Sequence, residues 1–294
     1  SSNRLTNLDV AVNKALTSLN CSNNQLNNLD IATNTALISL ECGYNLLNIL
    51  NVSRNTALKT LDCDYNLLTT LDVTKNIALT SLICGLNKLG SLDISKNTAL
   101  TLLNCTINEL TSLDVSKNLF LNSLRCNSNK FTSLDVSKNT ALTTLYCYNN
   151  PLLNSLNLKN GKNSLIGTGK IKIFYNPNLS CIQVDDVAYS NANWSAAKDA
   201  TASYSLNCTS LGISESVFNT ITVYPNPSKG EIYIDNVTLE KATVYDALGK
   251  LVKTTKFVGD SNSNTINLAG SPSGIYYIYL ERQGITVVKK IILE

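Results

Sequence analysis

The sequence predicts a mainly β protein, in which a repeat solenoid with a parallel β-sheet on its concave face is followed by a small antiparallel β-sandwich. Two observations predict the solenoid: seven cysteines recur every 21 residues, and an asparagine follows each of them three residues later. A third observation predicts the sandwich, because residues 220–294 contain short alternating runs bounded by Pro, Gly and Asn. A fixed period of this size is typical of stacked coils that share one core.

Each repeat is expected to contain one short strand and one return segment. Runs such as Leu19-Asn20-Cys21 alternate inward and outward, and copies in register place these strands side by side in a parallel sheet. The return segment, for example residues 134–142, is too short for a regular helix, and its Asp, Ser, Asn and Thr side chains favour turns. One coil cannot offset its own ordering cost, so neighbouring coils must supply the remaining burial.

The repeated cysteines occupy inward positions. They have neither histidine partners nor Cys-x-x-Cys spacing, so we expect buried, reduced side chains that act as small hydrophobes, with no metal site. They are Cys21, Cys42, Cys63, Cys84, Cys105, Cys126 and Cys147.

The core pattern Leu-x-x-Leu-x-Cys-x-x-Asn-x-Leu, present at Leu16, Leu19, Cys21, Asn24 and Leu26, resembles the leucine-rich repeat family in a short, 21-residue form. The resemblance implies that each asparagine amide bridges backbone groups of neighbouring coils that would otherwise be buried and unpaired. It also implies that ligands bind on the concave face. The expected asparagine ladder consists of Asn24, Asn45, Asn66, Asn87, Asn108, Asn129 and Asn150.

The repeats span residues 1–150, and their register is lost after Asn150. We expect the solenoid to be incomplete at its N-terminus, because residues 3–10 match late positions of a repeat and no cap precedes Ser1. Residues 151–208 are expected to cap the other end, with Trp194 covering the core. Cys181 and Cys208 depart from the 21-residue spacing, so we expect them to form a disulfide that closes the cap; two unpaired thiols are the alternative.

Residues 209–219 have the composition of a linker, and residues 220–294 predict the β-sandwich. Seven strands are expected at Ile221–Tyr224, Glu231–Asp235, Ala242–Tyr245, Leu251–Thr254, Thr265–Leu268, Ile275–Leu280 and Thr286–Ile292.

Motifs in this tail resemble the type A C-terminal sorting domain of the Bacteroidetes type IX secretion system. They are Tyr224-Pro225-Asn226-Pro227 with Gly230, then Tyr245-Asp246 with Gly249, then Gly274 with Tyr276, and finally Lys289-Lys290. The resemblance implies passage across the outer membrane to the cell surface or the extracellular space. It further implies binding to an outer-membrane shuttle, and removal of the tail by a sortase that anchors the remainder.

Composition excludes several functions. The chain has 24 basic and 21 acidic side chains without a basic cluster, so nucleic acid is not an expected partner. It contains no histidine, the commonest general base and metal ligand, and no cofactor or catalytic residue is predicted. No apolar run is long enough for a membrane helix, and no signal-like leader opens the chain.

Outward positions of the repeats contain two candidate binding patches. Glu41, Asp62 and Asp64 are expected on adjacent strands, with Tyr44 and Tyr65 one step along the same coils. Carboxylates beside aromatic rings suit sugar hydroxyls or a hard cation such as Ca²⁺, while a solvated acidic face is the alternative. Paired carboxylates also serve glycoside hydrolysis, but a flat sheet offers no pocket for it.

The second candidate patch consists of Tyr146, Tyr148 and Arg125 on neighbouring strands. Tyrosine and arginine are favoured where proteins dock, so these residues are candidates for partner recognition. Packing of the cap against the last coil is the alternative.

These observations favour an exported, non-enzymatic, cell-surface protein that binds an unidentified protein or glycan on its concave face. The alternative hypothesis is an accessory repeat module of a larger secreted enzyme whose catalytic part lies upstream of Ser1.

Overall fold

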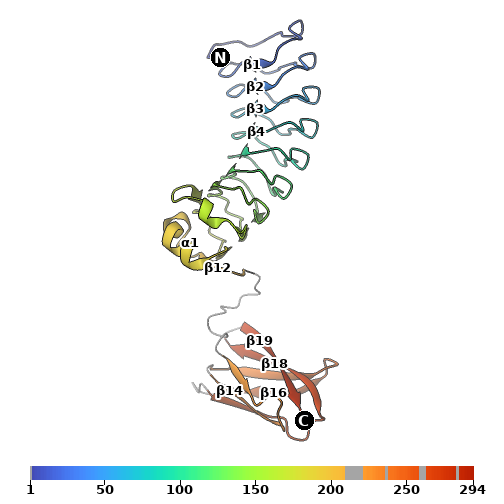
Figure 1. Ribbon diagram of the computed structural model, residues 1–294, viewed down its shortest axis with the longest axis vertical. Helices are drawn as coiled ribbons and strands as arrows, with labels where there is room; N and C mark the ends of the chain where they lie inside the picture. Colours follow the sequence, from blue (N-terminus) through green and yellow to red (C-terminus); the bar gives the residue numbers. More distant parts are fainter. Residues whose placement is uncertain (1, 209–220, 236–237, 258–262, 283–284) are drawn as a thin grey trace. The chain divides into compact units, whose positions relative to one another are not determined.

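The computed structural model describes residues 2–208, 221–235, 238–257, 263–282 and 285–294. The chain divides into two compact units, which we call the solenoid unit, Ser1–Cys208, and the sandwich unit, Thr209–Glu294. Figure 1 shows the stacked coils of the solenoid unit in blue to yellow and the strands of the sandwich unit in orange and red.

An eight-stranded parallel sheet runs along the solenoid unit, as the repeat predicts. Each strand is two or three residues long, and from β1 to β8 the register joins residues one 21-residue repeat apart, for example Leu40 with Leu61. Its strands, in spatial order, are β1 (Ser18–Asn20), β2 (Ser39–Glu41), β3 (Thr60–Asp62), β4 (Ser81–Ile83), β5 (Leu102–Asn104), β6 (Ser123–Arg125), β8 (Thr144–Tyr146) and β10 (Ile171–Lys172).

The interior of the solenoid unit is one continuous core of leucines and cysteines. Leu40, Leu61, Cys42 and Cys63 have no exposed surface, and all seven repeated cysteines are buried and unpaired. Burial raises the pKa of Cys105 and Cys147 to about 12, so these thiols stay protonated. The cysteines therefore act as core side chains.

The asparagine ladder joins each coil to its neighbour. Asn87 is a representative rung: its Nδ2 donates to the carbonyl of Cys63 in the preceding coil at 3.0 Å, and its Oδ1 accepts from the Leu68 N–H at 3.0 Å. The same amide also donates to Cys84 and Gly85 in its own coil. The side chain thus pairs backbone groups that the core would otherwise leave unsatisfied.

A second asparagine ladder, on the return segments, was missed by the sequence analysis. Asn97 is fully buried, and its Nδ2 donates to the carbonyls of Val73 at 3.0 Å and Asn76 at 2.8 Å in the preceding coil. Its Oδ1 has no hydrogen-bond partner among the described residues. The equivalent rungs are Asn34, Asn55, Asn76, Asn118 and Asn139.

The return segments of the first coils are turns, as expected, but those of the last coils become strands. A second parallel sheet has the order β12 (Ser203–Ser205), β11 (Cys181–Gln183), β9 (Ser155–Asn157) and β7 (Ser133–Asp135). Leu134 pairs with Leu156, and Leu156 with Ile182. This sheet forms where consecutive return segments offer each other extended backbone.

The last coil keeps the repeat geometry although its spacing changes. Asn176 lies 26 residues after Asn150, is fully buried, and accepts from the Asn150 N–H at 2.8 Å. No further coil follows it in the first sheet, and the carboxylate of Asp199 accepts from the N–H groups of Tyr175 and Asn176 at 2.8 and 2.7 Å. An aspartate therefore takes the place of the next coil.

One helix, α1 (Val187–Trp194), packs on this end of the core. Asp186 accepts from the Tyr189 N–H and caps the helix at its N-terminus. Trp194 is 1% exposed and donates through its ring N–H to the carbonyl of Ile166 at 3.1 Å. Two short 3₁₀ turns, η1 (Asn163–Leu165) and η2 (Ser195–Ala197), complete the segment.

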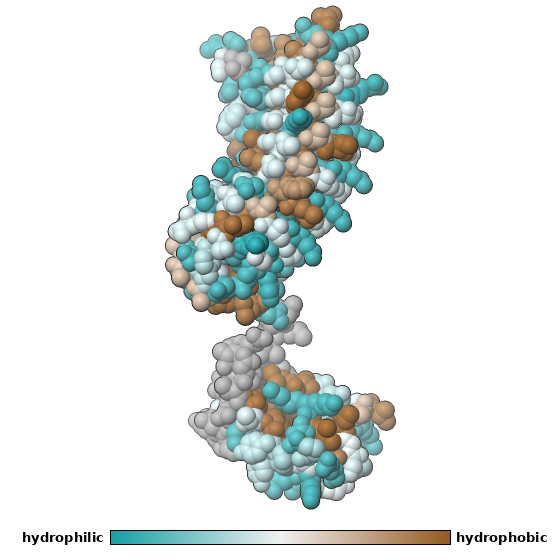
Figure 2. Space-filling model, viewed as in Figure 1, coloured by the Kyte–Doolittle hydropathy of each residue, from teal (hydrophilic) through white to brown (hydrophobic). Residues whose placement is uncertain are grey.

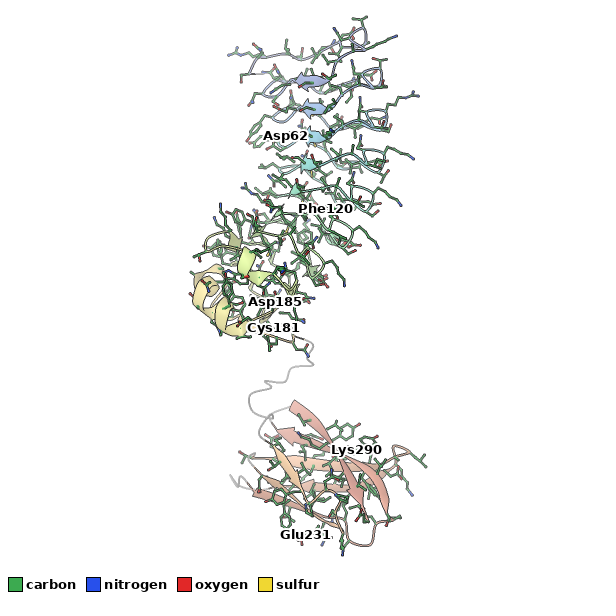
Figure 3. All side chains as sticks on the ribbon, viewed as in Figure 1. Asp62, Phe120, Cys181, Asp185, Glu231 and Lys290 are labelled. Atoms are coloured by element: carbon green, nitrogen blue, oxygen red, sulfur yellow. A yellow bond between two sulfur atoms is a disulfide. The ribbon has the colours of Figure 1, made fainter. Side chains whose placement is uncertain are left out.

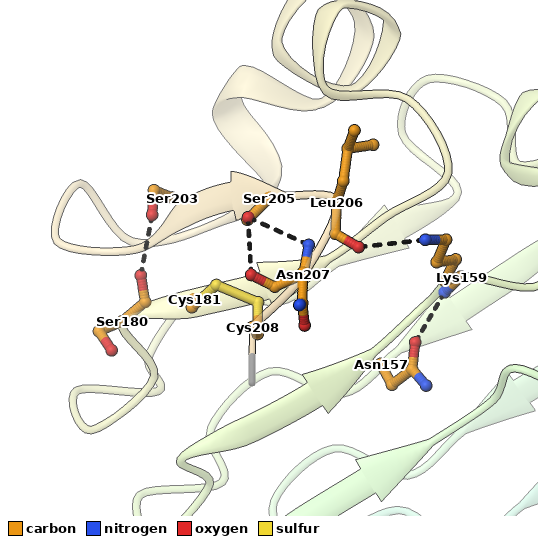
Figure 4. Close-up of a disulfide and its surroundings, with 9 residues drawn as sticks. All are labelled: Asn157, Lys159, Ser180, Cys181, Ser203, Ser205, Leu206, Asn207 and Cys208. Atoms are coloured by element: carbon orange, nitrogen blue, oxygen red, sulfur yellow. Dashed lines mark hydrogen bonds between the residues drawn. A yellow bond between two sulfur atoms is a disulfide. The ribbon is translucent and has the colours of Figure 1, made fainter. Parts of the chain in front are cut away.

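Cys181 and Cys208 form a disulfide with a Cα–Cα distance of 5.8 Å (Figure 4). The bond joins β11 to the last described residue of the solenoid unit. In Figure 4, Ser203 donates to the Ser180 carbonyl and Lys159 donates to the Leu206 carbonyl beside it. These contacts hold the end of the solenoid unit closed.

Two antiparallel sheets face each other in the sandwich unit, as predicted. The first has the order β13 (Thr222–Tyr224), β14 (Glu231–Asp235) and β17 (Ser263–Asn267), and the second β16 (Leu251–Lys256), β15 (Lys241–Asp246), β18 (Gly274–Arg282) and β19 (Ile285–Leu293). The core between them contains Ile232, Ile234, Val244, Ile278 and Ile291. No helix in the described part of the chain is long and apolar enough to cross a membrane.

Candidate binding face and sorting domain

The outward side chains of the first sheet form one continuous row, because the strands pair in register. The row has an acidic end at Glu41 and Asp62, a neutral middle, and a basic end at Arg125 and Lys172. Figure 3 labels Asp62 on its strand near the start of the row. In order, the row is Asn20, Glu41, Asp62, Ile83, Asn104, Arg125, Tyr146 and Lys172.

The structure brings the three predicted carboxylates together. Asp64 leans over the preceding coil, where its carboxylate occupies the space that a side chain at Gly43 would need. Partial burial, the charge of Asp62 and a hydrogen bond with Asp62 raise the pKa of Asp64 to about 6. Among the residues that the structure describes, no group of three or more His, Cys, Asp and Glu side chains is arranged to hold a metal ion.

Tyr44 and Tyr65 lie in the turns that directly follow β2 and β3, beside the acidic end. Their rings are stacked with centroids 4.6 Å apart and planes 8° from parallel. The two side chains are 47% and 52% exposed. Each ring therefore covers one face of the other and leaves its edges to solvent.

At the other end of the row, the aromatic side chains contact the last coil. The Tyr146 ring lies between two cations, with Arg125 Cζ at 5.3 Å and Lys172 Nζ at 4.8 Å from its centroid. Tyr148 stacks on Phe174 at 5.2 Å between centroids. These contacts correspond to the packing alternative, yet they also create a half-buried surface rich in aromatic and basic groups.

In the sandwich unit, the Tyr-Pro-Asn-Pro motif runs along the outer edge of β19. Asn226 donates to the Lys290 carbonyl at 3.1 Å and accepts from the Ile292 N–H at 2.9 Å. The Ser228 N–H donates to the Ile292 carbonyl at 2.9 Å, and the Glu294 N–H donates to the Ser228 carbonyl at 3.0 Å. The motif thereby covers polar backbone that an edge strand would otherwise expose.

The other motif residues shape turns or pack between strands. A Cβ on Gly230 would lie 2.8 Å from the Cα of Ala269, so this position has no room for a side chain. Asp246 accepts from the Leu248 and Lys250 N–H groups at 2.9 Å each, and Gly249 completes the turn at φ +80°. Tyr276 is 4% exposed and donates to the Pro272 carbonyl at 2.7 Å.

The remaining motif residues are more open to solvent. Tyr224, which is 45% exposed, donates its hydroxyl to Asp235 on β14, and Tyr245 meets Tyr279 edge to face at 5.1 Å. Lys290, labelled in Figure 3, is exposed on β19, whereas Lys289 is half-buried. A pocket lined by Tyr245, Asp246, Gly249, Tyr277 and Tyr279 lies on this sheet. Gly274, the first residue of β18, pairs with Leu293.

The solenoid unit has a leucine-rich repeat fold, and similar folds occur among solved structures. The leucine-rich repeat ectodomain of the receptor kinase GASSHO1/SCHENGEN3 from Arabidopsis thaliana is 22% identical, with a TM-score of 0.56 over 66% of this chain and 25% of that one. A leucine-rich repeat protein of Leptospira interrogans is 18% identical, with a TM-score of 0.50 over 69% of this chain and 58% of that one.

The functional domain of InlJ from Listeria monocytogenes, which includes a cysteine ladder, is 22% identical. That comparison covers 100% of this chain and 75% of that one, with a TM-score of 0.48. No curated protein matches the chain.

Residues 222–294 match the family of secretion system C-terminal sorting domains. The tail is thus a sorting domain of the type IX secretion system, and the protein is a secreted leucine-rich repeat protein that reaches the cell surface or the extracellular space. The sorting domain implies interaction with the type IX secretion machinery.

Proposed function

We propose that the protein is a non-enzymatic binding protein, which the type IX machinery exports and which holds a macromolecular ligand, a protein or a glycan, against the outward row of its solenoid. The observation that carries this proposal is the contrast between inward and outward positions. Inward positions repeat as Leu, Cys and Asn from coil to coil because the core demands them, whereas the residue in the outward row changes between every two neighbouring coils.

The charge of the row supports recognition of a partner. Its acidic end at Glu41 and Asp62 and its basic end at Arg125 and Lys172 are separated by Ile83 and Asn104. With neighbouring strands about 4.8 Å apart, Asp62 and Arg125 are separated by roughly 14 Å along the sheet. A ligand that matches both ends is favoured in one orientation only, and electrostatic complementarity of this kind gives specificity.

One binding experiment tests the proposal. The full chain would be measured by surface plasmon resonance against printed extracellular-matrix proteins and glycans, comparing wild type with Arg125→Ala and Tyr148→Ala. We expect at least tenfold weaker binding in both variants, and no change in Lys138→Ala, a control on the convex side. An equal loss of affinity in the control, or unchanged affinity in both variants, would contradict the proposal.

The alternative, an accessory module of a larger secreted enzyme, predicts a different outcome. Activity on a bound polysaccharide would then require sequence beyond residues 1–294. Expression of the complete open reading frame, followed by a reducing-sugar assay, separates the two: release of sugar ends by the complete protein would favour the alternative.

A further inference from the structure

Four consecutive coils carry an apolar side chain at the position just before the ladder asparagine. Tyr44, Tyr65 and Ile107 are 47%, 52% and 46% exposed, and Leu86 is half-buried between them. On the first two of these coils, Leu46 and Leu67 add exposed apolar surface two residues further along. We call these six residues the apolar ridge.

The backbone at this position is unfavourable for such side chains. Tyr44, Tyr65, Leu86 and Ile107 all have φ between +50° and +55°, the left-handed region that side chains other than Asn and Asp rarely adopt. Ile107 is the least suited, because it is branched at Cβ.

Other coils of the same chain show that the fold does not require apolar residues there. Asn23, Ser128 and Asn149 take the same conformation, with φ from +56° to +58°. Among residues with a side chain, asparagine is one of those that tolerate this region best. The ridge residues therefore combine two unfavourable properties, backbone strain and exposed apolar surface, in adjacent coils. Strain that the fold does not require indicates a contact with a partner.

An acidic border accompanies the ridge on the same coils. Glu41 lies three residues before Tyr44, and Asp64 immediately precedes Tyr65. Asp64 leans toward the preceding coil over Gly43, so its carboxylate lies close to the base of the ridge. Figure 2 shows one face of the solenoid unit, where brown apolar patches lie between teal hydrophilic side chains.

We propose that the apolar ridge and its acidic border bind an extended segment of a partner protein in which apolar side chains stand beside Lys or Arg. The inference rests on the proposed binding function and names the class of ligand at one end of the row. Four coils at about 4.8 Å span roughly 14 Å, the length of about four extended residues.

The ridge suits a polypeptide better than a sugar. The rings of Tyr44 and Tyr65 stack on each other, so they do not form an open aromatic platform for a sugar ring across both coils. Leu46, Leu67 and Ile107 have no side-chain groups for hydrogen bonding to hydroxyls. Apolar side chains of a partner, in contrast, gain from burying all six residues, and a neighbouring cation gains from Asp64.

The first test separates a binding role from a structural one. Tyr65→Asn and Ile107→Asn place in the ridge the residue that Asn23 and Asn149 already use. We expect their thermal midpoints to equal or exceed that of the wild type, because the strain is relieved. Midpoints that fall in both variants would show that the side chains stabilise the fold, and would overturn the proposal.

The second test uses a phage-displayed library of random dodecapeptides against the full chain. We expect enriched peptides that combine apolar residues with Lys or Arg, and at least a tenfold loss of their affinity for Tyr65→Asn, measured with the synthetic peptides by fluorescence anisotropy. The inference would be overturned if no peptide is enriched or if the enriched peptides are acidic or purely polar. Equal affinity of the peptides for wild type and Tyr65→Asn would also overturn it. So would a glycan that binds the wild type and loses affinity for Tyr65→Asn.

Failure here differs from failure of the proposed function. Peptides whose binding is lost in Arg125→Ala but not in Tyr65→Asn would keep the outward row as the binding face and exclude the ridge. Loss in neither variant, with Lys138→Ala as the control, would contradict both.

Discussion

Asn87 and Asn97 belong to two ladders with the same 21-residue period. The structure predicts that replacing Asn87 by alanine lowers the stability of the solenoid unit more than replacing Asn97. Truncation of Asn87 removes the oxygen that accepts from the Leu68 N–H at 3.0 Å in the buried core, and the described residues offer this N–H no other acceptor. The carbonyls that Asn87 contacts keep other donors: Asn66 for Cys63, and the Tyr65 N–H for Gly85. An orphaned buried N–H costs about 1–3 kcal/mol, and three weakened carbonyl contacts add to it.

Truncation of Asn97 leaves no such orphan. The Val73 carbonyl keeps the Asn76 N–H at 2.9 Å, and the Asn76 carbonyl keeps the Leu79 N–H at 3.1 Å. The change also removes an Oδ1 that has no partner in the described structure. We therefore expect the free energy of unfolding to fall by about 1 kcal/mol in Asn97→Ala and by about 2–4 kcal/mol in Asn87→Ala. The volume removed is the same in both, so the cavity contribution largely cancels.

Urea unfolding followed by tryptophan fluorescence measures the difference. The chain has a single tryptophan, Trp194, which is buried in the solenoid unit and is therefore insensitive to unfolding of the tail. Lys88→Ala, at an exposed neighbouring position, is the matched control. Burial alone predicts the opposite order, since Asn97 is 0% and Asn87 8% exposed. Equal costs, or a larger cost for Asn97→Ala, would refute the hydrogen-bond reasoning.

Three further predictions concern thiols, pH and domain independence. Ellman's reagent should find no reactive thiol in the native chain and seven after unfolding without reductant, because the ladder cysteines are buried and Cys181 is paired with Cys208; thiols that react in the native state would contradict it. Since the pKa of Asp64 rises from 3.8 to about 6 on folding, the native state binds the extra proton between these values and stability should fall as pH rises through them. Asp64 is partly exposed, so solvent screening reduces the loss to about 1 kcal/mol; a urea midpoint that falls equally between pH 4 and 7 in Asp64→Asn would exclude this origin. Residues 1–208 expressed alone should keep the Trp194 emission and urea midpoint of the full chain, and a lower midpoint would show that the solenoid depends on its tail.

Much of the fold could be predicted because the period fixes the register. Cys42 and Cys63 must stack if every coil has 21 residues, and the strands follow from that stacking. The seven sandwich strands were placed by alternation, with ends that shifted by up to two residues, as in β18 (Gly274–Arg282). Local patterning was sufficient wherever one face of a segment is buried.

Features that depend on neighbouring coils could not be read from the pattern. The rung at Asn176 was missed because an insertion lengthens its spacing, and only its contact with Asn150 reveals it. The second ladder was assigned to local turn formation, since Asn139 resembles any turn asparagine until its donor groups are seen to reach the preceding coil. The second sheet, from Leu134 to Tyr204, likewise requires knowing which return segments become adjacent.

The candidate site was predicted in part. Glu41, Asp62 and Asp64 were placed together because the register was known. The apolar ridge at Leu86 and Ile107 was not recognised, since its distinguishing property is a backbone angle that the residue types do not favour.

The central claim is that the tail directs export of a solenoid that folds without it. Its most direct test is cell fractionation of a type IX-competent bacterium that expresses the chain with and without residues 222–294, together with an unrelated exported reporter fused to residues 209–294. We expect the full chain and the fusion to be accessible to protease on intact cells, while the truncated chain accumulates, folded, in the periplasm. A truncated chain that still reaches the surface, or a fusion that stays in the periplasm, would contradict it.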